Sequence, residues 1–134
     1  MTKESGIGMT IGLDDATPAL QQIESDVLTW SFSTPRGVKD VTGVNSAGVE
    51  RLLLLADMQA TLNGEFDVGA NLAHAVLKTV PSTDAARTLT LIHSAQTLTG
   101  EGIVSDYALN RAADGSLSWT APWLYNATTA PAWS

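Results

Sequence analysis

The chain has 134 residues, no cysteine, and seven basic against fourteen acidic residues, which gives a formal net charge of −7. This length is typical of one domain, and the missing cysteines exclude disulfide frameworks, thiolate nucleophiles and cysteine-ligated zinc. The basic residues are scattered, which argues against nucleic-acid binding, because such binding relies on clustered Lys and Arg at phosphates.

The sequence carries no targeting or membrane signal. No apolar run approaches the roughly 18 residues of a membrane span. The N-terminal "MTKESGIGMTIG" has neither the basic start nor the apolar stretch of a signal peptide. A soluble protein made in the cytoplasm, without membrane insertion, is therefore expected.

The first third of the chain predicts an arm, a strand and a loop. Residues 1–24 show little strand pattern beyond "GMTIG" and are expected to form an N-terminal arm, with about a turn of helix in "TPALQQI". "LTWSFS" alternates and predicts a strand with Leu28, Trp30 and Phe32 on its apolar face. "STPRGVKD", residues 33–40, is expected to be an inter-strand loop because it contains Pro, Gly and two positive charges.

The middle of the chain holds the strongest strand pattern. In "MQATLNGEF" the even positions are apolar or small, whereas the odd positions Gln59, Thr61, Asn63 and Glu65 are polar, which predicts a half-buried strand. The preceding "SAGVERLLLLADM" is ambiguous. It suits a short helix capped by Ser46 or, with four consecutive leucines, a strand buried on both faces.

One helix is predicted, followed by strands to the end. "NLAHAVLKTVPSTD" offers Asn71 as N-cap and Pro81 as the stop, with an inner stripe of Leu72, Ala75 and Val76. "TLTLIHS", "GIVSDYALNR" and "LSWTAPW" alternate as strands, with Asp114-Gly115 turning between the last two. Residues 125–134 are expected to form an irregular C-terminal tail.

These patterns predict a single mainly β domain of antiparallel strands with one α-helix. The predicted core consists of Leu28, Trp30, Phe32, Leu62, Phe66, Leu89, Leu91, Tyr107, Leu109, Leu117 and Trp119.

No catalytic, metal or cofactor site is predicted. His74 and His93 lie on different predicted elements, and neither has a ligand partner three or four residues away. "GIGMTIG" begins like a dinucleotide fingerprint but places Ile11 where the third glycine belongs. A G-x-S-x-G nucleophile elbow is missing too, so the sequence does not indicate an enzyme.

Two stretches resemble the major tail tube protein of long-tailed (siphovirus-type) bacteriophages. They are "ERLLLLADMQATLNGEFD", which precedes "ANLAHAVLKTV", and "LTGEGIVSDYALNRAADGSLSWTAPW". The resemblance covers about residues 40–134. It implies an antiparallel β-sandwich or partly open barrel with a flanking α-helix, in subunits that form hexameric rings stacked into a hollow tube for the phage DNA.

The resemblance also implies partners and surfaces. Tape-measure, tail terminator and tail tip proteins are the expected partners, in a virion tail that is assembled in the cytoplasm of the host bacterium. The polar positions Gln59, Thr61, Asn63 and Glu65 are expected to face the lumen of the tube or a neighbouring subunit. The loop residues expected to contact the next ring are Pro35, Arg36, Gly37, Val38 and Lys39.

Alternatives remain open at this level. One is a tube protein of a secretion or contractile injection system. Another is a small β-sandwich binding module, such as a capsid decoration or carbohydrate-binding domain, which should display a row of exposed aromatic residues.

Overall fold

The computed structural model describes residues 3–17, 19–67 and 73–134. In these ranges the chain is mainly β, as predicted, with one short helix. The elements are β1 (Thr10–Asp14), β2 (Leu20–Gln22), β3 (Val27–Ser33), β4 (Arg36–Asp40), β5 (Arg51–Ala56), β6 (Gln59–Glu65), α1 (Ala73–Leu77), β7 (Arg87–His93), β8 (Gln96–Val104), β9 (Ala108–Arg111), β10 (Leu117–Tyr125) and β11 (Ala132–Trp133). No helix in the described part of the chain is long and apolar enough to cross a membrane.

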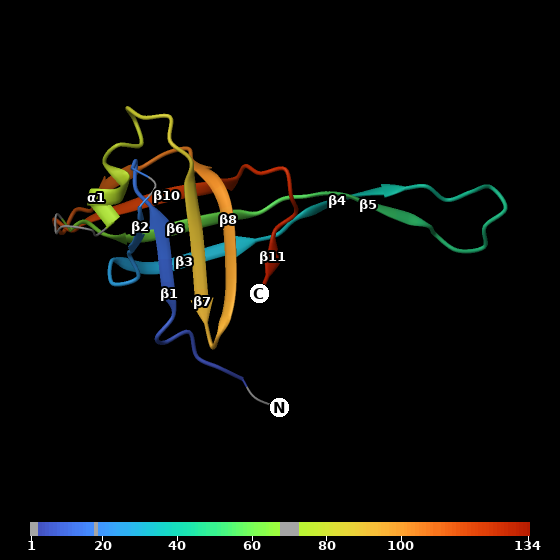
Figure 1. Cartoon of the computed structure of the whole chain (residues 1–134), viewed down its shortest axis with the longest axis horizontal. Coiled ribbons are helices and arrows are strands. Elements are labelled where there is room, and N and C mark those ends of the chain that lie inside the picture. The colour runs from blue at the N-terminus through green and yellow to red at the C-terminus, as the bar shows by residue number, and fades with distance from the viewer. Residues whose placement is uncertain (1–2, 18, 68–72) are drawn as a thin grey trace.

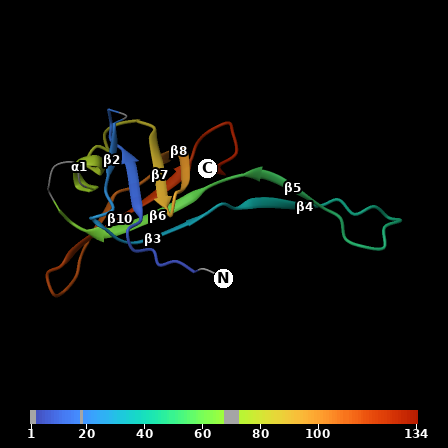
Figure 2. The ribbon, with the colours of Figure 1, turned by 60° about the horizontal axis from the view of Figure 1, so that its bottom comes forward.

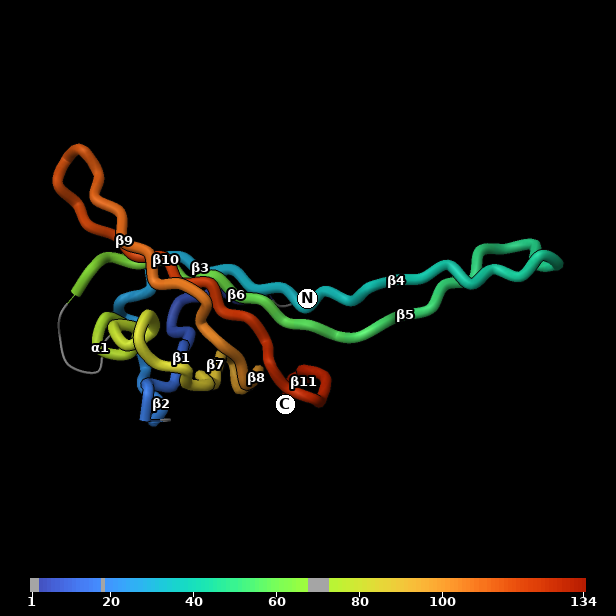
Figure 3. The backbone as a smooth tube through the Cα atoms, turned by 90° about the horizontal axis from the view of Figure 1, so that it is seen from above, coloured from blue at the N-terminus to red at the C-terminus, as the bar shows by residue number. Residues whose placement is uncertain are grey.

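Nine strands form one antiparallel sheet that folds over itself into two layers. Its main order is β2-β1-β7-β8-β10-β6-β3, with β9 on β10 and β11 on β8, and it does not close into a barrel. Strand β8 belongs to both layers, because residues 96–102 pair with β7 and residues 102–104 pair with β10. In Figure 3 the layer of β3, β6, β9 and β10 lies on one side, and β1, β2, β7 and α1 lie on the other. We call the layer of β3, β6, β9 and β10 the second layer, and the layer of β1, β2, β7 and α1 the first layer.

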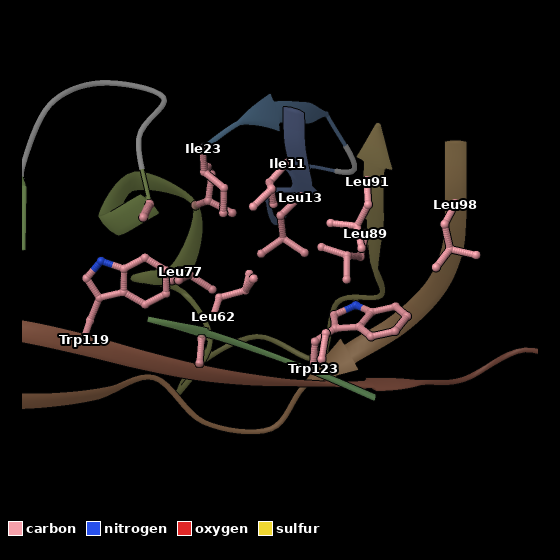
Figure 4. Packing of buried hydrophobic residues seen from close by; sticks show 14 of the residues in the cluster. Ile11, Leu13, Ile23, Leu62, Leu77, Leu89, Leu91, Leu98, Trp119 and Trp123 are labelled. Carbon is pink, nitrogen blue, oxygen red and sulfur yellow. The ribbon is translucent and has the colours of Figure 1, made fainter. Parts of the chain in front are cut away.

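The two layers enclose one hydrophobic core, which Figure 4 shows from close by. Trp119 and Trp123 of β10 are its largest buried side chains, and both indoles have hydrogen-bond partners. Trp119 Nε1 donates to the Glu65 carbonyl at 3.1 Å, and Trp123 Nε1 donates to the Arg87 carbonyl at 2.9 Å. Each indole is therefore buried without leaving its N–H unpaired.

Two glycines permit the close approach of strands and indoles. A Cβ on Gly64 would lie 2.9 Å from Trp119 Nε1 and still closer to the Asp26 carbonyl oxygen. A Cβ on Gly102 would overlap both the indole of Trp123 and the backbone of β10. The core packing around the tryptophans therefore requires glycine at both positions.

Helix α1 is held at both ends by buried polar groups. At its beginning the Ala73 N–H donates to Asp26 Oδ2 at 3.1 Å. At its end Arg87 Nη1 donates to the Val76 carbonyl at 2.7 Å, and Nη2 donates to Thr79 Oγ1 at 2.8 Å. Burial lowers the pKa of the Arg87 guanidinium, while the negative charges of Asp15 and Asp14 oppose this shift. The helix itself buries Ala73, Val76 and Leu77, whereas the expected cap Asn71 and stripe residue Leu72 lie outside the described residues.

The N-terminal segment differs from the sequence prediction. Residues 1–24 were expected to form an arm, yet β1 and β2 lie within this range and join the sheet. Ile11 and Leu13 of β1 are fully part of the core. "TPALQQI" gives strand β2 instead of a helical turn, because its residues pair with β1. Five residues are too short a strand for alternation to stand out in sequence.

Two predicted core residues are exposed. Leu28 is 65% exposed, because the register of β3 on β6 shifts between Val27 and Thr29 and turns Leu28 outward. Leu109 is 49% exposed, because β9 pairs with β10 at a margin that the first layer does not cover. Of the other predicted core residues, Leu62, Leu89, Leu91 and Trp119 are buried, and Trp30, Phe32, Phe66, Tyr107 and Leu117 are half-buried.

Candidate assembly surfaces

The outward face of the second layer is uncharged except at one position. Strand β6 directs Ala60, Leu62 and Gly64 inward and leaves the four predicted positions, Gln59, Thr61, Asn63 and Glu65, on the outer face. Cross-strand pairing adds their neighbours on β3 and β10. The whole face of these three strands consists of Leu28 at the register shift of β3 and of Thr29, Ser31, Ser33, Gln59, Thr61, Asn63, Glu65, Ser118, Thr120, Pro122 and Leu124.

Hydroxyl and amide groups dominate this face, which we call the polar face. Thr120 Oγ1 donates to Asn63 Oδ1 at 2.8 Å across the β6–β10 pair. Glu65 is its only ionisable side chain, and it contains no Lys or Arg. A polyanion in front of the polar face would therefore find no cation to bind.

The second layer ends in two free strand edges. Among the described residues β3 pairs only with β6, and β9 pairs only with β10. Each edge therefore presents a row of backbone N–H and C=O groups to solvent, the arrangement that invites pairing with another strand. A monomeric protein would have to protect such edges from unwanted pairing, whereas in a closed ring each edge can pair with a strand of the neighbouring subunit.

The segment predicted as a loop, residues 33–40, is part of a long hairpin. Figure 1 and Figure 2 show β4 and β5 extending far beyond the two layers, in continuation of β3 and β6. We call residues 36–56 the hairpin arm. Four of the five residues expected to contact another ring, Arg36, Gly37, Val38 and Lys39, lie on β4, and Pro35 lies directly before it. Pro35 and Gly37 therefore lie where β3 is followed by β4, and not at the tip of a loop.

The hairpin arm is held together by its own contacts. Val38 pairs with Leu53 and Lys39 with Leu52. Arg36 Nε and Nη2 donate to the Leu54 carbonyl at 3.0 and 2.9 Å. At the tip Thr42 donates to the Asp40 carboxylate through both N–H and Oγ1, which lowers the pKa of that carboxyl. The ambiguous leucine run thus forms a strand, but this strand is exposed to solvent instead of buried on both faces.

The C-terminal tail is also more ordered than predicted. Residues 132–133 form β11 on β8, and Ser134 and Thr97 exchange backbone hydrogen bonds of 2.8 and 2.9 Å. The Trp133 ring lies 5.9 Å from that of Phe32 in an edge-to-face arrangement. The tail therefore closes the end of the two layers from which the hairpin arm leaves.

A second contact missed by sequence reasoning joins the N-terminal segment to the β7–β8 turn. Ser94 and Ala95 have φ of 49° and 64°, the left-handed values that a two-residue hairpin turn needs. Ser94 Oγ donates to the Glu4 carboxylate, and His93 Nε2 lies 3.4 Å from the same oxygen. This turn was not predicted from the sequence, because Ser-Ala stands where Asn-Gly or Asp-Gly is the usual signal.

The histidines take part in packing. His74 Nδ1 lies 3.0 Å from the Tyr107 hydroxyl, inside a row of rings that runs from Phe66 to Trp119. Burial, and then the charge of Asp26, raise the pKa of the Tyr107 hydroxyl. The described residues contain no group of three or more His, Asp or Glu that could hold a metal ion.

The comparison with solved structures bears on the fold. A chain in the virion of a native gene transfer agent particle superposes with a TM-score of 0.78 at 15% identity, over 97% of this chain and 99% of that one. A chain in the tail of an empty gene transfer agent particle, refined with helical C6 symmetry, gives 0.74 at 17% identity over 98% of each. This chain shares their fold.

A third similar structure comes from the sixfold-symmetrised baseplate of the anti-feeding prophage, with a TM-score of 0.66 at 9% identity, over 100% of this chain and 97% of that one. No protein-family model and no curated protein sequence matches the chain. The three similarities therefore concern the fold alone, with almost no help from sequence identity.

Proposed function

We propose that the chain is a structural subunit of a phage-type tail, which assembles into hexameric rings stacked as a hollow tube for DNA. The observation that carries this proposal is the second layer, whose uncovered polar face lies between two free strand edges. In a ring the edge of β3 would pair with β9 of the next subunit. The polar faces would then form a continuous lining around the bore.

The composition of the polar face suits that bore. Serine, threonine and amide side chains keep a bore wet, and the missing cations leave DNA free to slide. The net charge of −7 supports the same role, since it disfavours adhesion of a polyanion. The two gene transfer agent chains add support because their fold occurs within tail-bearing particles, one of them solved with C6 symmetry.

The role proposed is structural and not enzymatic, in a virion tail built in the host cytoplasm. Tape-measure, terminator and tip proteins remain the proposed partners, and a non-contractile tail remains the proposed tail type. The anti-feeding prophage match favours one second candidate, a tube-type protein of a contractile injection system. A large tape-measure gene downstream, with no sheath gene beside it, would favour the phage tail.

Electron microscopy of the concentrated purified protein tests the assembly. We expect rings or hollow tubes with sixfold symmetry, with β3 adjacent to β9 of the neighbouring subunit. A protein that remains monomeric at high concentration, with or without a purified tip complex as a seed, would overturn the proposal.

The bore is tested by adding cations to the polar face. Thr61→Lys with Asn63→Lys should leave tubes intact and slow DNA release from phage particles. Thr88→Lys with Thr90→Lys is the matched control, because these residues also lie two apart on one strand, on the outward face of the first layer. DNA release at the normal rate from the first variant, or equal slowing by both, contradicts the bore assignment.

A further inference from the structure

A half-buried glutamate lies in a pocket between the beginning of β3 and the segment that leads into β1. The pocket has a volume of about 360 Å³, and Met9, Val27 and Trp30 contribute apolar walls. Glu24 lines it as well, and its Oε2 is buried without a hydrogen-bond partner among the described residues. A buried carboxylate oxygen without a donor costs free energy. We call this cavity the β3 pocket, and it lacks a donor for Glu24.

The neighbouring carboxylate differs from Glu24 because it is already occupied. Asp26 is buried, and its Oδ2 accepts from the Ala73 N–H at 3.1 Å. Asp26 therefore stabilises the subunit itself, whereas Oε2 of Glu24 is left for a donor from outside. A cationic donor fits best, because hydrogen bonds to a carboxylate are strongest when both groups are charged.

The other edge of the second layer carries a cation without a partner. Arg111, the last residue of β9, is the only Lys or Arg on β3, β6, β9 and β10. It is exposed, and its guanidinium makes no hydrogen bond or ion pair with the described residues. Leu109 pairs directly with Trp119 and therefore points to the core side of the layer, as does Arg111 two positions along. An exposed leucine and an exposed arginine thus lie together beyond the margin of the core.

The strand register places these two side chains at the level of the β3 pocket. One row of paired residues crosses the second layer from the β9 edge to the β3 edge and consists of Leu109, Trp119, Gly64 and Val27. If β9 of the next subunit continues this row, its Leu109 comes beside Val27. All three strand pairs are antiparallel, so β9 and β3 run in opposite directions. Arg111 consequently lies two positions before Val27, next to Glu24.

We propose that the β3 pocket receives β9 of the neighbouring subunit, with Arg111 donating to the Glu24 carboxylate and Leu109 packing on the apolar walls. This inference rests on the proposed ring and specifies how adjacent subunits recognise each other. The contact is heterologous, because each subunit offers the pocket at one edge and the two side chains at the other. The ion pair also fixes the register between the two edges, since a slipped β9 would leave both charges unpaired.

Charge reversal tests the pair. Glu24→Arg and Arg111→Glu are examined by electron microscopy for rings and tubes, each alone and as an equimolar mixture. Alone, each variant should raise the protein concentration needed for assembly at least about tenfold, because like charges meet at every contact. In the mixture the two variants can alternate around a hexameric ring, so that every contact again joins opposite charges. We therefore expect the mixture to assemble at the concentration of the unaltered protein.

Two further sets of variants control for charge and folding. Lys78→Glu makes the same change at an exposed lysine directly after α1 and should leave assembly unaltered. If a reversed variant melts below the intact subunit, Glu24→Gln, Arg111→Gln and their combination replace it. Each single neutral variant should raise the assembly concentration, and the double variant should raise it no further, because the second change removes no additional contact.

The outcomes separate this pair from the proposed function. Assembly of either reversed variant alone at the normal concentration would overturn the pair and leave the tube standing. So would a mixture of well-folded reversed variants that assembles no better than its components, or neutral variants whose effects add. If the unaltered protein forms no rings or tubes, the proposed function itself fails.

Discussion

The two-layered body and the hairpin arm are both built from antiparallel strands, but their strands differ in burial. In the body, strands such as β6, β7 and β10 alternate between a face against the core and an outward face, and the indoles are buried with their N–H groups paired. In the hairpin arm both faces are exposed and leucines run consecutively. The difference teaches that the body satisfies its own packing, whereas the hairpin arm is patterned for contacts outside the subunit.

The two deletions should have the largest effects of the changes considered, and each should disrupt a different property of the chain. Replacing residues 36–56 by Asn-Gly should leave a folded monomer, because the Asp57 N–H already donates to the Pro35 carbonyl at 3.0 Å. Removing residues 1–20 should unfold the chain, because it takes β1 with Ile11 and Leu13 out of the core. Circular dichroism with thermal melting tests folding, and electron microscopy tests tube formation.

A hairpin-arm deletion that melts far below the intact subunit would show that the arm supports the body. Full-length tubes from the same deletion would remove the arm from ring stacking. A cooperative, native-like melt of the variant lacking residues 1–20 would instead support the sequence prediction that the N-terminal residues form an arm outside the folded body.

The same substitution at two glycines sharpens the contrast. Gly64→Ala should cost about 3 kcal/mol of unfolding free energy, because its Cβ would overlap the Asp26 carbonyl and crowd Trp119. Gly48→Ala in the hairpin arm should change it by less than about 0.5 kcal/mol, since nothing lies within 4 Å of its Cβ. Urea titration of both variants measures the difference, and equal stabilities would contradict the packing described for Gly64.

Replacing a buried and an exposed arginine separates stability from assembly. Arg87→Met should lower the unfolding free energy by about 2 kcal/mol, because the Val76 carbonyl and Thr79 lose their donor. Arg51→Met should leave stability within about 0.5 kcal/mol but shorten tubes, as it leaves Asp40 on the same face of the hairpin arm without its cross-strand neighbour of opposite charge. Thermal melts and tube-length distributions would expose the opposite pattern if the roles were reversed.

The sequence predicted the body well where local alternation and burial coincide, as in β6, β7 and β10. It failed at Leu28, because a register shift between two paired strands leaves no trace in one strand's pattern. It also left the leucine run undecided between a helix and a doubly buried strand. The pattern is typical of burial on two faces, yet both faces of β5 are exposed in the subunit, and no spacing within one chain shows what would cover them.

The smallest expected effect compares one turn motif in the two regions. Asp114 at the β9–β10 turn accepts hydrogen bonds from the backbone N–H and the hydroxyl of Ser116. Asp40 in the hairpin arm accepts hydrogen bonds from the backbone N–H and the hydroxyl of Thr42 in the same way. Both sets of hydrogen bonds hold the carboxyl pKa below its usual 3.8. A carboxyl whose pKa is lower in the folded than in the unfolded chain stabilises the turn at pH values above its unfolded pKa. This stabilisation is lost as the pH falls through the folded pKa.

If the hairpin arm is fully ordered only on a ring, Asp40 in free subunits reports an average over folded and unfolded ribbon. We therefore expect Thr42→Ala to move the pKa of Asp40 upward by less than Ser116→Ala moves that of Asp114, in a carboxyl NMR titration of monomers. Equal shifts would mean that the hairpin arm is as ordered alone as the body. Assembly would then find both faces of the ribbon already formed.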